Sequence, residues 1–334
     1  MASRILSRVT DRPYARVQVR VRRHRAQREL ASFDDRLKAA QEAEEPRIPA
    51  EWREASVLAA TIHPFAGLGH QVSSWVSGEL WARDLGMRFA GGALTQNSSN
   101  LFSLDRDVNV PRATPKVRLQ AVPNELNAHA LTVLKSEVDE ALARYRRPVQ
   151  FSLALDQARF DQTPASATIR QAVLGGTQGA SIEKWESSVP RVVLHVRRGD
   201  VNASTPGSDT VPRYVDLAWH QRVATQLQEH PALRDLPISA VLQDPQPGEV
   251  RDALEPLGVE VRAGGERDSD FAWMASARVL VAAPSSFSFF AGMGSRGVVV
   301  ARHPWWHHVP SEGRWVRADM EGALDTEELT RALE

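Results

Sequence analysis

The chain of 334 residues contains no cysteine, which excludes disulfides, thiol nucleophiles and thiolate metal sites. Lysine is also scarce, because only four of the 41 basic residues are lysine and the rest are arginine. We attribute this excess of arginine mainly to coding bias. A single arginine is therefore weak evidence for a binding site.

A net charge and a long apolar run are also missing. The 41 basic residues balance 41 acidic ones, so no overall field draws the protein to nucleic acid. No apolar run approaches the roughly 18 residues that a membrane-spanning helix needs, and no signal-peptide core is visible. We therefore expect a cytoplasmic protein that does not bind nucleic acid.

The first fifty residues differ in composition from the rest. Nine arginines stand in the first thirty residues against Asp11 and Glu29, and residues 34–45 are polar and helix-prone. Pro46 and Pro49 then mark a linker. We expect residues 1–50 to form a basic, partly helical arm that is a solvated extension. The alternative is a surface for anionic lipid or for an acidic partner. A lipid surface would place the protein peripherally at the inner face of the membrane.

The remaining sequence predicts two α/β units, at residues 51–185 and 186–334. Apolar strands alternate with helices of ten or so residues, which is typical of parallel sheets. In the first unit, a strand at 56–62 precedes a glycine-bearing loop and a helix from 72 to about 85. The second unit starts with an apolar strand near residue 192, and its further strands are expected at 238–242, 259–261, 279–283 and 297–301. The glycine-rich segment 175–180 is expected to be a mobile loop.

A possible anion site follows the strand at 192–196. Arg197, Arg198, Gly199 and Asp200 come directly after it. Ligands bind beyond the carboxyl ends of parallel strands, and adjacent guanidinium groups are costly there unless an anion meets them. The segment therefore predicts a diphosphate site. Because neighbouring side chains project to opposite faces of a strand, we expect one arginine to point at the ligand and the other to support it. A structural ion pair with Asp200 is the alternative.

Two strand-to-helix loops are further candidates. Ser285 and Ser286 open a helix, where a serine caps the helix and free N–H groups bind phosphate. Gly67 and Gly69 precede another helix in a similar way, although any tight turn uses glycine. His195 is either a satisfied core residue or a contact to phosphate or hydroxyl.

An aromatic and histidine-rich run at 305–308 is a weaker candidate. The neighbouring histidines lack ligand spacing, so we expect no metal site. Trp305 and Trp306 either line a sugar or acceptor surface or fill the core.

Three segments resemble, in order and spacing, the motifs of the α1,2-, α1,6- and protein O-fucosyltransferases. Residues 195–200 resemble the H-x-R-R-x-D segment of this superfamily, and residues 67–71 are similar to its G-x-G-N-Q loop. Residues 270–288 resemble its D-F-x-x-M and S-S-F-S segments. The resemblance covers about residues 57–75 and 190–302.

The resemblance implies two facing Rossmann-like domains, the GT-B arrangement, with the donor held mainly by the second. It implies inverting transfer of fucose from GDP-fucose to a glycan or glycoconjugate, with neither a metal nor a cofactor. The implied catalytic residues are Arg197, Arg198 and Asp200. The implied donor-binding residues are His195, Arg197, Arg198, Asp270, Phe271, Ser285, Ser286, Phe287, Gly67, Gly69 and His70.

The match departs from the family at two points. His70 stands where the family usually has asparagine, which implies a different hydrogen-bonding pattern near the sugar or an altered donor. No catalytic base is obvious, since neither Asp200 nor Asp209 is singled out by spacing. The alternatives are therefore a transferase for another nucleotide sugar and a non-catalytic protein that binds a nucleotide sugar or a partner.

Overall fold

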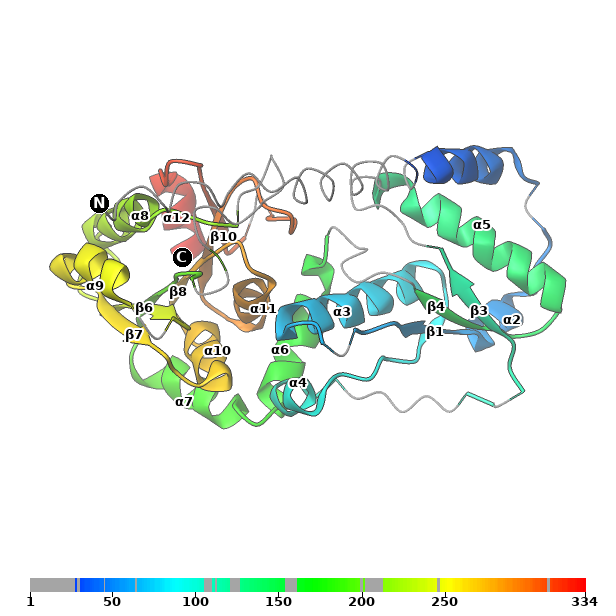
Figure 1. The fold of residues 1–334 in the computed structure, drawn as a ribbon, viewed down its shortest axis with the longest axis horizontal. Helices are drawn as coiled ribbons and strands as arrows, with labels where there is room; N and C mark the ends of the chain where they lie inside the picture. The colour runs from blue at the N-terminus through cyan, green and yellow to red at the C-terminus, as the bar shows by residue number, and fades with distance from the viewer. Residues whose placement is uncertain are drawn as a thin grey trace, which may run out of the picture.

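The computed structural model confirms the predicted α/β class. It describes residues 28, 31–44, 46–63, 65–104, 110–111, 113–120, 127–153, 161–198, 201, 213–244, 247–310 and 313–334. Each half of the chain contributes one parallel β-sheet with helices around it, so the protein has two Rossmann-like units. Figure 1 shows the two sheets in opposite halves of an elongated molecule, with α3, α6 and α11 between them.

The first unit is built on a four-stranded sheet. Its strands are β1 (Val57–Ala60), β2 (Arg88–Phe89), β3 (Lys116–Leu119) and β4 (Gln150–Leu153), in the order β2-β1-β4-β3. All neighbouring strands in it are parallel. The named helices of this part are α2 (Ala50–Ala55), α3 (Leu68–Asp84), α4 (Gln96–Leu101) and α5 (Asn127–Tyr145). The predicted strand, glycine loop and helix correspond to β1, the loop after it and α3.

The prediction of a solvated N-terminal arm is wrong for its helical part. Residues 31–42 form a helix, and Phe33 on it is fully buried in the hydrophobic core. Leu37 packs against the same core, because positions i and i+4 share one face of a helix. Arg36 adds an ion pair of 3.0 Å to Glu137 on α5. The arginine-rich residues 1–27, on which the proposed lipid contact depends, lie outside the described residues.

The second unit contains a six-stranded sheet with the strand order of a Rossmann fold. Its strands are β5 (Val192–His195), β6 (Ile238–Leu242), β7 (Glu260–Ala263), β8 (Val279–Ala282), β9 (Val298–Arg302) and β10 (Trp315–Ala318). The order β7-β6-β5-β8-β9-β10 reverses its direction between β5 and β8. In such sheets, the point of reversal is where ligands bind. The helices of this unit are α8 (Leu217–Glu229), α9 (Gly248–Leu254), α10 (Arg267–Ala275), α11 (Ser286–Gly294) and α12 (Thr326–Leu333).

Two helices connect the units. The segment expected to be a mobile loop at 175–180 instead contains the end of α6 (Ser166–Gly175) and the start of α7 (Gly179–Ser188). Helix α6 packs against α11 and α7 packs against α10. Both helices therefore pack against helices of the second unit, although the predicted boundary after residue 185 assigned them almost entirely to the first unit.

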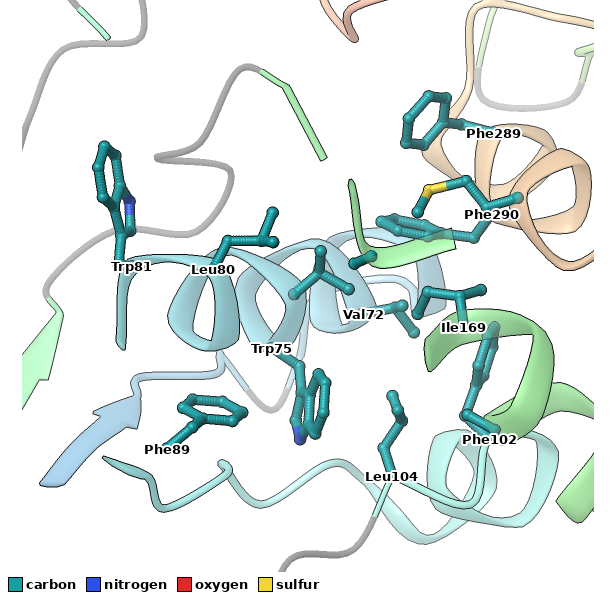
Figure 2. Close-up of a cluster of buried hydrophobic side chains, with 14 of the residues drawn as sticks. Val72, Trp75, Leu80, Trp81, Phe89, Phe102, Leu104, Ile169, Phe289 and Phe290 are labelled. Atoms are coloured by element: carbon teal, nitrogen blue, oxygen red, sulfur yellow. The ribbon is translucent and has the colours of Figure 1, made fainter. Parts of the chain in front are cut away.

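A continuous apolar core joins the two units. Alternate residues of β5 face opposite sides of the second sheet, so Val193 packs toward α10 and α11 while Val192 joins a separate cluster with α8 and α9. Figure 2 shows the first of these cores, in which Trp75 on α3 belongs to the same cluster as Phe289 and Phe290 on α11. This shared core fixes how the two units face each other. Across the described part of the chain, no helix has the length and apolar character needed to cross a membrane.

Candidate functional site

A cleft of about 930 Å³ lies where the first unit meets the carboxyl ends of β5 and β8. Its walls come from the loop before α3 in the first unit and from the segments that follow β5 and β8 in the second. Nine of the residues predicted from the sequence line it, namely Gly67, Gly69, His70, His195, Arg197, Arg198, Ser285, Ser286 and Phe287. The cleft lies at the reversal point of the second sheet, which is where ligands bind in sheets of this kind.

Arg197 and Arg198 both line the cleft, although only one was expected to face a ligand. Strand β5 ends at His195, so the alternation of side chains no longer applies to the residues after it. Arg197 donates from Nη1 to the hydroxyl of Ser285 over 3.1 Å. Arg198 donates from Nη1 to the carbonyls of Arg197 and Val215, at 2.9 and 3.1 Å. Its Nε and Nη2 atoms have no hydrogen-bond partner among the described residues.

Two more arginines line the cleft. Arg267, at the start of α10, forms an ion pair with Asp268 and donates to the carbonyl of Asn97 over 2.8 Å, so it links the two units. Arg213 lies over the ring of Trp306 at 5.8 Å. Among the described residues that line the cleft, none is an aspartate or a glutamate. The protein as a whole is neutral, so positive charge is concentrated at this site.

Two helix N-termini meet at the cleft. Gly67 is the N-cap of α3, and Ser285 is the N-cap of α11, where its hydroxyl accepts the N–H of Phe287 over 3.3 Å. A Cβ on Gly69 would lie 2.6 Å from the Cβ of Ser286 and 2.7 Å from the backbone nitrogen of Phe287. Gly69 therefore lets α3 of one unit touch α11 of the other. The sequence suggested only a tight turn or a ligand contact for this glycine.

His195 is a neutral hydrogen-bonding group beside the arginines. Its side chain is buried, and burial, Arg197 and His220 lower its pKa to about 3. The ring of Phe287 lies 6.0 Å from that of His195, measured between centroids. At neutral pH the imidazole therefore carries no charge and can donate from one nitrogen and accept at the other.

His307 is a functional candidate that the sequence analysis missed. Its Nε2 lies 2.9 Å from the hydroxyl of Ser286, and its ring stacks on Phe289 with centroids 4.0 Å apart. Burial, with a smaller effect of His70, lowers the pKa of His307 to about 3, so it holds the serine as a neutral partner. Trp306 lines the cleft, while Trp305 is buried in the core. The aromatic run at 305–308 was the available signal.

The remaining predicted residues lie behind the cleft wall or outside the described chain. Phe271 is fully buried, with its ring 5.5 Å from that of Phe287, so it supports a lining residue. Asp270 is buried too, and burial raises its pKa to about 6. Its Oδ2 has no hydrogen-bond partner among the described residues. Asp200 and Asp209 lie outside the described residues.

Comparison with known proteins gives weak structural similarity only. No protein-family model matches the chain, and no curated protein matches its sequence significantly. The solved structure of POFUT1 in complex with GDP-fucose is 12% identical, with a TM-score of 0.48 over 80% of this chain and 98% of that one. POFUT1 in complex with GDP is 13% identical, with a TM-score of 0.45 and the same coverage. The E. coli heptosyltransferase WaaC with ADP is 12% identical, with a TM-score of 0.37 over 84% of this chain and 95% of that one.

The chemistry of the cleft itself indicates what kind of ligand it can bind. Guanidinium groups and helix N-termini both donate hydrogen bonds to anionic oxygen atoms, and guanidinium does so in a fixed fork geometry. The described residues include no cluster of three His, Asp or Glu side chains arranged to hold a metal ion. The arrangement is suited to a ligand with one or more phosphate groups and a neutral part that reaches toward the first unit.

Proposed function

We propose that this protein is a glycosyltransferase that takes its sugar from a nucleoside diphosphate sugar. GDP-fucose is the proposed donor, and a glycan or glycoconjugate is the proposed acceptor. The observation that carries the proposal is a cleft with four arginines, two helix N-termini and no carboxylate among its described lining residues. The choice of GDP-fucose rests on the motif resemblance at 67–71, 195–200 and 270–288.

In the proposed reaction, Arg197, Arg198 and the start of α11 hold the diphosphate. An acceptor hydroxyl attacks the anomeric carbon from the face opposite the diphosphate, so the configuration is inverted. The bond from that carbon to the β-phosphate oxygen breaks, and its electron pair passes to the diphosphate. Negative charge therefore grows where the arginines lie, and donors that are already in place stabilise it without reorganising.

Asp270 and Phe271 have supporting roles in this proposal. Neither residue lines the cleft, and both are buried. Phe271 holds Phe287 at the cleft wall, and Asp270 precedes Phe271 on α10. The two residues would therefore position the wall against which the nucleoside of the donor lies.

The test is calorimetric titration of the whole protein with GDP, UDP and ADP, followed by GDP release from GDP-fucose. We expect GDP to bind at least ten-fold more tightly than UDP or ADP, and GDP-fucose to be hydrolysed slowly without acceptor. GDP release should continue in EDTA, because the permanently charged Arg197 and Arg198 already bind the diphosphate in this proposal. Tighter binding of UDP or ADP would redirect the proposal to another nucleotide sugar. Activity that EDTA abolishes and manganese restores would contradict the role of the arginines.

A further inference from the structure

Glycosyl transfer needs a group that accepts the proton of the attacking hydroxyl, and the cleft offers few candidates. This inference rests on the proposed function. No carboxylate is found among the described residues that line the cleft, and its arginines are permanently protonated. Among the described lining residues, the side chains able to take up a proton are the imidazoles of His70 and His195.

His195 is unsuited to this task. Its side chain is buried, and its pKa lies at about 3 because of burial, Arg197 and His220. A base with so low a pKa takes a proton weakly, since efficient bases have a pKa near the working pH. His195 also lies on β5, directly before the arginines that would hold the leaving group.

His70 has the placement that His195 lacks. It lies on the first turn of α3, in the first unit, and is only half-buried. Its neighbour Gly69 touches Ser286 at the start of α11, where the diphosphate is proposed to bind. His70 therefore lines the cleft from the first unit, whereas Arg197 lines it from the second.

The described groups around His70 are one histidine and the arginines of the cleft. His307, on the segment after β9, is close enough for the two rings to interact electrostatically. The charged residues among the described lining of the cleft are Arg197, Arg198, Arg213 and Arg267, and Arg267 is ion-paired with Asp268. The arginines are permanently protonated, and burial lowers the pKa of His307 to about 3, so these neighbours of His70 are poor proton acceptors.

We propose that His70 is the catalytic base of this enzyme. A nitrogen of its imidazole takes the proton of the acceptor hydroxyl while the hydroxyl oxygen bonds to the anomeric carbon. The diphosphate leaves with the electron pair of the broken bond, and the imidazolium later gives its proton to solvent. In the absence of acceptor, a water molecule takes the place of the hydroxyl, so donor hydrolysis uses the same base.

The test compares His70→Gln and His70→Ala with His129→Gln and Asp200→Asn. His129 is an exposed histidine on α5 and serves as the matched control. GDP affinity, melting temperature and the pH profile of GDP release from GDP-fucose are measured for each. We expect both His70 variants to keep GDP affinity within about three-fold and to lose kcat by roughly 100-fold or more, the usual contribution of a general base.

The pH profile separates a chemical role from a structural one. Histidine changes charge between about pH 5 and 8, so the wild-type kcat should rise across that range and the His70 variants should show no such rise. Added imidazole should restore part of the activity of His70→Ala. A His70 variant that keeps the wild-type kcat and profile, or a rise with pH that Asp200→Asn alone abolishes, would overturn the proposal. A wild-type protein that binds no GDP would instead refute the proposed function.

Discussion

At the scale of single residues, the site depends on how Arg197 is held. Its Nη1 bonds to Ser285, the residue that caps α11, so the guanidinium lies directly beside a helix N-terminus. Both groups attract an anion, and their contributions act at the same place. A lysine at this position keeps the charge but loses the fork of donors.

We therefore predict that Arg197→Lys weakens GDP binding by roughly 10- to 100-fold, since hydrogen bonds to charged groups contribute about 1.5–3 kcal/mol. Isothermal titration calorimetry measures this change. Arg222→Lys, at an exposed position on α8, is the control and should bind GDP as the wild type does. Equal affinity in the two variants would show that Arg197 does not contact the diphosphate.

The residues of this site could be predicted in part because parallel strands end at one edge of a sheet. Arg197 and Ser285 each follow an apolar strand, and that pattern alone placed both at the ligand edge. His307 follows no such strand end. It reaches Ser286 through a segment whose path is fixed by packing on Phe289, and local sequence does not encode that packing.

At the scale of elements, the cleft depends on the contact between α3 and α11. Gly69 and Ser286 meet there, one from each unit. A methyl group at position 69 would collide with backbone as well as with a side chain, so no change of rotamer relieves it. The two helices would have to move apart.

We predict that Gly69→Ala destabilises the protein by about 1–3 kcal/mol, the usual cost of overpacking, and also weakens GDP binding. Urea unfolding and calorimetry measure the two effects. Gly67→Ala is the matched control, because nothing lies within 4 Å of a Cβ there and its φ of −62° suits alanine. The close contact of α3 with α11 would be disproved if both variants lost equal stability.

Helices α6 and α7 show where prediction of elements from sequence failed. Gly175, Gly176 and Gly179 have the composition of a loop, yet only residues 176–178 separate the two helices. Both helices are stabilised by packing on α10 and α11, which come much later in the chain. Strands β6 and β8 were predicted well because every residue in them is buried and all but Ser239 are apolar.

At the scale of the whole molecule, the second unit is built around several buried neutral histidines. Burial lowers the pKa of His195 and His307 to about 3 and that of His220 to about 4. In the unfolded chain each would have a pKa near 6.5. Below that pH the unfolded state binds more protons than the folded state, so acid favours unfolding.

Asp270 has the opposite effect on how stability depends on pH. Burial raises its pKa to about 6, so between about pH 4 and 6 the folded state holds a proton that the unfolded state has lost. This carboxyl makes the folded state more stable, relative to the unfolded state, as the pH falls through that window. The three histidines destabilise the folded state on acidification and only one carboxyl stabilises it. The net effect of lowering the pH is therefore a loss of stability.

We therefore predict that the free energy of unfolding is highest above about pH 6.5 and falls steadily between about pH 6.5 and 4.5. Urea unfolding at several pH values in that range measures the slope. His307→Phe removes one of the three groups, so its slope should be shallower by up to about 1.4 kcal/mol per pH unit. His129→Gln replaces an exposed histidine and should keep the wild-type slope. Equal slopes in His307→Phe and the wild type would mean that His307 takes up no extra proton on unfolding, and that burial does not hold it neutral in the folded protein.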